Sequence, residues 1–187
     1  MNKIKINTHA FPYPMPMVIV GTIVDEKANF MAVGWVNRVN YKPPLIGVGL
    51  GNHHYTNIGI MEQKSFSINI PSIDLMEKTD YCGLVSGKNV DKSEIFETFF
   101  GTIKTAPMIK ECALNMECKL IKTIEFATNQ LFIGEIISAY TEEKYMTDNK
   151  PDIQKIKPFT LTMPDNNFWA IGENLGKAWS IGNRLKK

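Results

Sequence analysis

The chain has 187 residues, of which 44% are hydrophobic and 21% charged, the balance of a globular protein with one sizeable core. We therefore expect a single domain over residues 1–187. The formal net charge is only +2, which excludes the strong basic field of a typical nucleic-acid-binding protein, so we expect no nucleic acid partner.

The first third of the chain predicts three strands. Residues 17–24 (MVIVGTIV) are rich in β-branched side chains, and the polar residues 25–29 suit a hairpin turn. A second strand over residues 30–36 would then pair antiparallel with the first. Pro43-Pro44 interrupts the pattern, and residues 45–50 (LIGVGL) predict the third strand.

Helical and extended patterns alternate over the next segment. Residues 56–63 have helix-like content, with Thr56 as the expected N-cap, and residues 65–70 (SFSINI) alternate as a strand does. Ser72 is placed to cap a helix over residues 73–85, which would end at Ser86-Gly87.

The second half of the chain predicts two long strands. Apolar residues alternate with polar ones over 114–120, and residues 131–140 (LFIGEIISAY) form a suitable partner. Residues 142–156 are polar enough for a surface excursion, and a short strand is expected over residues 159–163. Successive strands without regular crossover helices predict an all-β or α+β fold, an antiparallel barrel with a few short peripheral helices.

The N-terminus and the cysteines exclude several classes of protein. The first 16 residues contain no apolar run of signal-peptide length, and residues 17–24 are too short to span a bilayer, so we expect a cytoplasmic protein without a membrane partner. Cys82, Cys112 and Cys118 are odd in number and lack CxxC spacing, which argues against a disulfide framework and a zinc site. We expect all three to be reduced and at least two to lie in the core.

Two glycine-containing stretches have both a structural and a binding interpretation. Gly47, Gly49 and Gly51 would leave one face of a strand bare, either for a packed helix or for a flat ligand. GLVSGKN, residues 83–89, lacks the spacing and the hydroxyl of a Walker motif. Its serine, glycine and lysine form either an anion-binding loop together with Lys92 or an ordinary solvated loop.

The histidines favour no metal site and no hydrolytic triad. His53 and His54 are adjacent, and in an extended chain they would point to opposite sides, so they could not easily bind one metal ion. No nucleophile elbow of the GxSxG kind is present. We therefore expect no metal and no catalytic side chain.

The stretch NFMAVGWVNRVNYKPPL, residues 29–45, is unusual for a strand that only fills a core. Glycine, tryptophan, asparagine and arginine either weaken the packing of a strand or need a polar partner. Something other than protein could therefore lie against it.

Several segments together resemble the flavin reductase-like, FMN-binding split-barrel family, and most closely its flavoredoxin branch. They are PYPMPMVIVGT, NFMAVGW, KPPLIGVGL, HHYTNIGIMEQKSFSINIP, CGLVSGKNVDK, KPDIQKIKPF and FWAIGENLGKAWSIG. The resemblance covers nearly the whole chain. It implies a homodimeric split barrel of Greek-key type that holds FMN near the subunit interface.

The resemblance also implies a set of cofactor-binding residues. The isoalloxazine ring would be lined by Asn29, Met31, Ala32, Val33, Gly34 and Trp35, and farther along by Leu50, Gly51, Asn52 and His53, with Trp169 from one of the two subunits. The phosphate would be held by Thr56, Ser86, Gly87, Lys88 and Lys92. The family commonly has Thr or Ser after the Asn-x-Met of the second strand, where Ala32 and Gly34 stand here, so redox tuning by hydroxyl groups is missing.

The implied function is an FMN-dependent oxidoreductase. Its chemistry would take place at flavin N5, with electrons passing from NADH, NADPH or a redox-protein partner to an acceptor, and the protein would bind, orient and tune the flavin. A non-catalytic flavin-binding or sensing module on the same barrel is the alternative.

Overall fold

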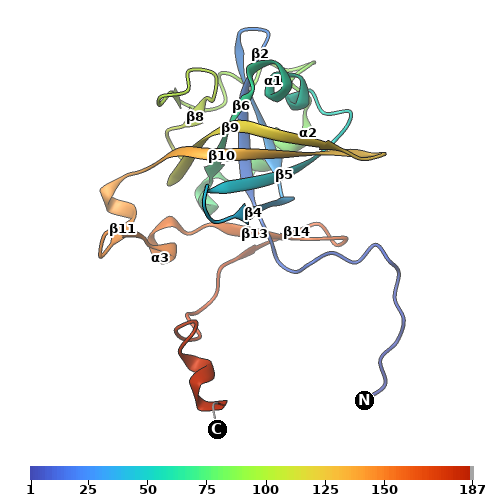
Figure 1. Ribbon diagram of the computed structural model, residues 1–187, viewed down its shortest axis with the longest axis vertical. Coiled ribbons are helices and arrows are strands. Elements are labelled where there is room, and N and C mark those ends of the chain that lie inside the picture. The colour runs from blue at the N-terminus through green and yellow to red at the C-terminus, as the bar shows by residue number, and fades with distance from the viewer. Residues whose placement is uncertain (186–187) are drawn as a thin grey trace.

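Seven strands form one antiparallel sheet in this computed structural model, which describes residues 1–185. Their spatial order is β3-β2-β6-β9-β10-β5-β4 (Figure 1). The strands are β2 (Val18–Val24), β3 (Lys27–Val33), β4 (Val36–Asn40), β5 (Leu45–Gly51), β6 (Ser65–Ile70), β9 (Leu114–Glu125) and β10 (Asn129–Thr141).

The sheet is curled because its two edge strands follow each other in the chain. Only Gly34 and Trp35 join β3 to β4. Three Cα-to-Cα steps of about 3.8 Å separate Val33 from Val36, so these residues lie at most about 11 Å apart. The opposite edges of the sheet must therefore approach each other. We call this joint, Gly34–Trp35, the seam, and the resulting barrel confirms the predicted fold class.

Smaller elements surround the barrel. Strands β1 (Met15–Pro16), β13 (Phe159–Thr162) and β14 (Asn167–Ala170) form a second sheet, while β7 (Thr98–Phe99) pairs with β8 (Met108–Ile109) and β11 (Met146–Thr147) with β12 (Lys150–Pro151). The helices are α1 (Thr56–Gln63), α2 (Met76–Leu84) and α3 (Ile153–Ile156), with 3₁₀ turns η1 (Ile73–Leu75), η2 (Glu143–Tyr145) and η3 (Ile181–Leu185). Among residues 1–185, none of these helices has the length and apolarity needed to cross a bilayer.

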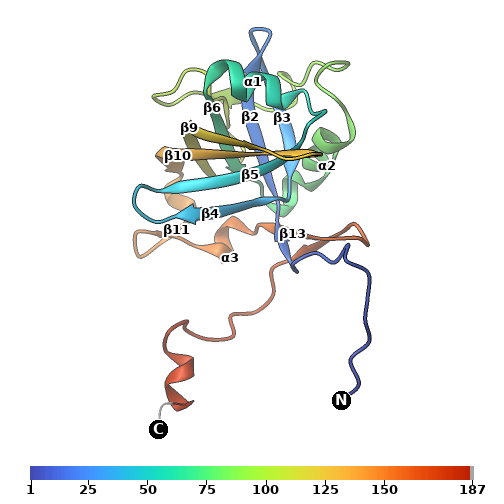
Figure 2. The same cartoon turned by 45° about the vertical axis from the view of Figure 1, so that its right-hand side comes forward.

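The position of the small sheet matters for the site. Figure 2 shows β13 beneath β4, at the end of the barrel opposite α1. Both ends of the chain leave the body from this lower end as extended arms (Figure 1). We call residues 1–14 the N-terminal arm and residues 171–185 the C-terminal arm.

Strand β2 is buried on both faces. Val18 and Val20 point into the cluster inside the barrel, while Ile19 belongs to a second cluster with Phe30 of β3 and Cys82 of α2. All three cysteines are buried and free, as predicted.

Two predicted helix starts are wrong. Tyr55 occupies the N-cap position of α1, and the Thr56 hydroxyl accepts a hydrogen bond from Asn29 Nδ2 instead of capping the helix. The helix predicted over residues 73–85 is the 3₁₀ turn η1 followed by α2, and Ser72 makes no capping side-chain hydrogen bond.

The second predicted strand is also wrong at its end. It stops at Val33, and the next strand, β4, was not predicted at all. Four of the five residues of β4 are exposed, because it is an edge strand paired only with β5. The core strands β2, β5, β6, β9 and β10 are found where the sequence predicted them, although β9 and β10 are longer.

Candidate functional site

A cleft runs along the seam. It has a volume of about 500 Å³, and we call it the seam cleft. Its walls are the end of β3, the end of β5, the start of β10 and the hairpin tip at Met163, with small side chains or bare backbone over much of their area. The lining residues are Met31, Ala32, Val33, Gly34, Trp35, Gly49, Leu50, Gly51, His53, His54, Gly83, Thr128, Asn129 and Met163.

A second cleft adjoins the first and has a more polar character. Its volume is about 210 Å³, and we call it the loop cleft because the loop after α2 forms one wall. Met31, His53, His54 and Gly83 line both clefts, so the two spaces meet at these residues. The loop cleft is lined in addition by Tyr55, Thr56, Cys82, Leu84, Val85, Ser86, Gly87 and Lys92.

The structure brings together most of the residues that the sequence predicted. Eight predicted ring contacts line the seam cleft, and Thr56, Ser86, Gly87 and Lys92 line the loop cleft. The eight are Met31, Ala32, Val33, Gly34, Trp35, Leu50, Gly51 and His53.

The Asn29 side chain lies beside the loop cleft, in contact with Thr56. Its Nδ2 donates a hydrogen bond of 2.9 Å to Thr56 Oγ1, while its Oδ1 is buried without a hydrogen-bond partner. A Cβ atom added at Gly87 would collide with that Oδ1, so only glycine lets the loop approach Asn29 this closely. Asn29 was expected along the ring, and the structure places it beside Thr56 and Gly87 instead.

Lys92 is a buried cation at the base of the loop cleft. Only 4% of its surface is exposed, and its Nζ donates to Phe30 O at 3.0 Å and to Cys82 O at 2.8 Å. An ammonium group has three donors, so one remains for a further acceptor. Burial lowers the pKa of Lys92 from its ordinary value, because a charge removed from water is less stable. An anion in the loop cleft would offset that cost.

The two histidines lie where the clefts meet. Their ring centroids lie 4.2 Å apart with the ring planes tilted by 40°, so the expectation that they point to opposite sides is wrong. The reason is that residues 52–54 form a turn after β5, closed by a hydrogen bond from His54 N to Gly51 O. Burial, and then the positive neighbours His53 and Lys92, lower the pKa of His54. His54 was missed as a site residue.

The three glycines of β5 make room for side chains of this protein. A Cβ atom on Gly47 would lie 2.9 Å from Val39, one on Gly49 would lie 3.4 Å from Trp35, and one on Gly51 would lie 2.9 Å from His53. No helix covers them, so the helix-packing interpretation is wrong. Gly49 and Gly51 still line the seam cleft beside these side chains.

Four predicted residues, Asn29, Asn52, Lys88 and Trp169, are not in the lining of either cleft. Asn52 Nδ2 donates to the carbonyl groups of Phe126 and Ala127, and Lys88 lines a neighbouring hollow that it shares with Asn29. The Trp169 indole, on β14, donates to Thr162 Oγ1. Within residues 1–185, no three histidine, cysteine, aspartate or glutamate side chains are grouped so that they could hold a metal ion.

Comparison with known protein families gives one match over most of the chain. The model of the flavin reductase like domain matches residues 10–157. The matched region contains the seam, the loop cleft and every lining residue of the seam cleft except Met163.

Solved structures share the fold closely. The flavoredoxin of Methanosarcina acetivorans is 56% identical, with a TM-score of 0.97 over 99% of this chain and 100% of that one. The flavoredoxin of Desulfovibrio vulgaris (Miyazaki F) is 36% identical, with a TM-score of 0.86 over 96% of this chain and 100% of that one. A split-barrel protein of Shewanella frigidimarina is 22% identical, with a TM-score of 0.79 over 90% and 87%, and shows the shared fold alone.

Proposed function

The chain belongs to the flavin reductase like family, and on this premise we propose that it is an FMN-dependent oxidoreductase of the flavoredoxin kind. The observation that carries the proposal is the junction of the two clefts. The seam cleft, which is lined largely by small residues and backbone, adjoins the smaller loop cleft, which contains the buried cation Lys92. An apolar cleft that adjoins a cationic one suits a flat heterocycle with an anionic tail. A flavin nucleotide has this form, and the two similar structures are named flavoredoxins.

The seam cleft fits the ring by size and by its walls. Its volume of about 500 Å³ lies within the range of roughly 300–1,000 Å³ typical of small-molecule sites. Ala32, Gly34, Gly49 and Gly51 allow the main chain to approach a planar group, with Trp35 beside it. Backbone amides and carbonyls of the β3 end would meet the polar edge of the ring.

The loop cleft fits the phosphate by the chemistry of its donors. It is lined by the free donor of Lys92 and by the hydroxyl groups of Ser86 and Thr56. The Asn29 amide is hydrogen-bonded to the Thr56 hydroxyl. A phosphate monoester carries close to two negative charges at neutral pH and forms its strongest hydrogen bonds to charged donors. The buried Asn29 Oδ1 without a partner is also explained here. If the amide is turned over, Thr56 donates to Oδ1 and the Asn29 NH₂ group faces the phosphate.

The proposed division of work leaves the redox chemistry to the cofactor. When bound, FMN supplies the capacity to accept electrons from one partner and pass them to another. Neither cleft is lined by a carboxylate. Lys92 therefore gives the site an electropositive character, which suits an anionic ligand.

We further propose that the electron donor is NADH, NADPH or a redox protein, and that the active form is a cytoplasmic homodimer. Gly34 and Trp35 of the seam cleft lead directly into β4, which lies near the end of the barrel from which the arms leave (Figure 1). This position supports the dimer, because a second copy could approach there.

Purification followed by absorbance spectroscopy tests the proposal. We expect flavin bands in the purified protein, or their appearance with stoichiometric FMN, and bleaching of these bands on addition of NADH, NADPH or a reduced carrier protein. Bound flavin that none of these reduces would favour a sensing module. The absence of a bound chromophore, together with no uptake of added FMN, would remove the proposal.

A further inference from the structure

The C-terminal arm carries apolar side chains that are unprotected within this chain. Trp179 is fully exposed, and Leu175 and Leu185 expose 88% and 87% of their surface. Large apolar side chains gathered on one segment indicate a surface that another molecule covers, because water disfavours their exposure.

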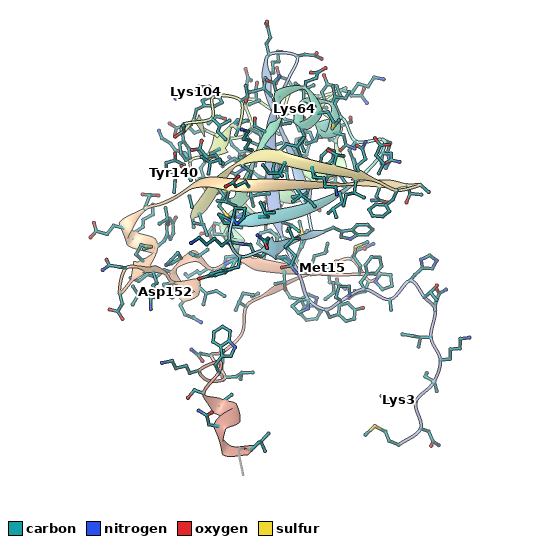
Figure 3. The ribbon with its side chains drawn as sticks, in the orientation of Figure 1. Lys3, Met15, Lys64, Lys104, Tyr140 and Asp152 are labelled. Carbon is teal, nitrogen blue, oxygen red and sulfur yellow. The ribbon has the colours of Figure 1, made fainter. Side chains whose placement is uncertain are left out.

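The arm makes no packing contact that could hold it against its own body. All residues from 171 to 183 are exposed, and the hydrogen bonds given for residues 171–185 stay within the segment. Gly172 and Gly182 have no heavy atom within 4 Å of the position of an added Cβ atom. The N-terminal arm differs, because its Phe11 ring lies 6.1 Å from that of Trp35 on the body, while Lys3 lies far from the body (Figure 3).

The extended placement of the arms is nevertheless shared with a crystal structure. The flavoredoxin of M. acetivorans superposes with a TM-score of 0.97 over 99% of the chain. The arms make up more than a tenth of the chain, so this score is reached only if they superpose as well. A segment without contacts to its own body keeps one placement when another molecule holds it.

An apolar groove lies beside the seam at the same end of the barrel. It has a volume of about 670 Å³, and we call it the apolar groove. Half-exposed Trp35 and Val39 stand in it, and Gly34, Trp35, Gly49 and Asn129 belong to both this groove and the seam cleft. Its remaining lining is Phe11, Pro12, Pro14, Met15, Pro16, Val36, Asn37, Gly47, Phe126, Gln130 and Leu131.

The groove also borders an open sheet edge. Strand β4 ends the seven-stranded sheet, so its outer edge has unpaired backbone groups that an extended segment can bind. Strand β4, which lines the groove with Val36, Asn37 and Val39, lies near the end of the barrel from which the arm leaves (Figure 1). A two-fold axis at this end would bring each arm to the groove of the other copy, which is the usual geometry of a homodimer.

We propose that the C-terminal arm of one copy lies in the apolar groove of a second copy of this chain, with Trp179 beside Trp35. The inference rests on the homodimer proposed above. It adds that each seam cleft is completed by a segment of the other subunit, which shields the ring-binding space from water.

Site-directed cross-linking tests this placement. A Ser180→Cys chain and a Val39→Cys chain carrying different affinity tags are expressed together and oxidised. The native cysteines are buried, and burial raises the pKa of Cys82 to about 11, so they remain unreactive. We expect a disulfide-linked pair that carries both tags. Lys104→Cys, exposed on the body far from the arms, replaces Val39→Cys as the control and should give no such pair (Figure 3).

Removal of the arm measures its contribution. Sedimentation of a chain that ends at Ile171 should show a dimer dissociation constant at least about tenfold weaker than that of the full chain, and Trp179→Ala an intermediate value. A full-length dimer that gives no cross-link with Val39→Cys overturns the arm placement and leaves the homodimer standing. A full-length monomer overturns both. FMN uptake, measured separately, reports on the proposed function in either case.

Discussion

The two ends of the site are built in opposite ways. The seam cleft is formed mainly by main chain and small residues such as Ala32, Gly34 and Gly49, so its open volume depends on the lack of large side chains at these positions. The loop cleft depends on hydrogen-bonded polar side chains, above all Lys92, which donates to two backbone carbonyls, and Thr56, which accepts from Asn29. Binding of the flavin ring in the seam cleft should therefore be weakened by substitutions that add atoms. Binding of the phosphate in the loop cleft should be weakened by substitutions that remove them.

Replacing Lys92 should produce the largest effect at the tail end. Lys92→Met keeps the length of the side chain but removes the charge and leaves Phe30 O and Cys82 O without their donor. We expect FMN to bind about 100-fold more weakly, while riboflavin, which lacks the phosphate, changes little. Unfolding in urea should show a loss of about 2 kcal/mol. Lys88→Met, on the exposed loop nearby, is the matched control and should leave both properties almost unchanged.

A larger side chain where the two clefts meet should test whether the flavin ring binds there. Gly83 lies in α2 and lines both clefts, and a Cβ atom there would lie 3.4 Å from Ala32 Cβ, an ordinary contact. Gly83→Leu should weaken FMN and riboflavin alike by about 30-fold, because its outer atoms enter the space of the ligand. Gly83→Ala should bind normally and stabilise the fold by about 0.5–1 kcal/mol through helix propensity. Equal binding by all three chains, measured by fluorescence titration, would contradict the placement.

The Asn29–Thr56 pair should contribute less than Lys92. Thr56→Val preserves the shape of the side chain and removes the hydroxyl that accepts from Asn29 Nδ2. We expect about tenfold weaker FMN binding and a loss of about 1 kcal/mol in the free energy of unfolding. Thr56→Ser, which retains the hydroxyl, should restore most of both. Failure of serine to rescue binding would mean that packing matters here and hydrogen bonding does not.

His54 should give the smallest effect, visible as a pH dependence of stability. Because its pKa is lowered in the folded state, the unfolded chain binds the proton more readily, and the fold loses stability as pH falls below about 6.5. The loss should be roughly half a kcal/mol, since the partly exposed ring is screened by solvent. Denaturation of His54→Gln at pH 7 and pH 5 should show a smaller loss than the native chain, whereas His9→Gln on the N-terminal arm should behave like the native chain.

The strands that build the core could be predicted because burial leaves a pattern in the sequence. Strand β2 is almost continuously apolar because both of its faces are covered. Apolar and polar residues alternate at the start of β9 because one of its faces is more exposed to solvent. Strand β4 could not be found in this way. Its residues VNRVN are mostly exposed and gain their order from pairing with β5, which no local pattern records.

The residues expected at the site stay a prediction, and the structure shows how they are arranged. The resemblance to a known family supplied Met31 to Trp35 and Lys92, which the structure places in adjoining clefts. His54 was missed because no local pattern marks the turn that follows β5. Asn29 was expected along the ring, but it lies near the start of β3, where its side chain donates a hydrogen bond to Thr56.

Isothermal titration of the protein with FMN and with riboflavin tests the central claim most directly, since the two ligands share the ring and differ in the phosphate. If the ring lies in the seam cleft and the phosphate beside Lys92, FMN should bind at least about 100-fold more tightly than riboflavin, a difference that disappears in Lys92→Met. Equal affinity of the native protein for the two ligands, or a preference for FMN that persists without Lys92, would contradict the account.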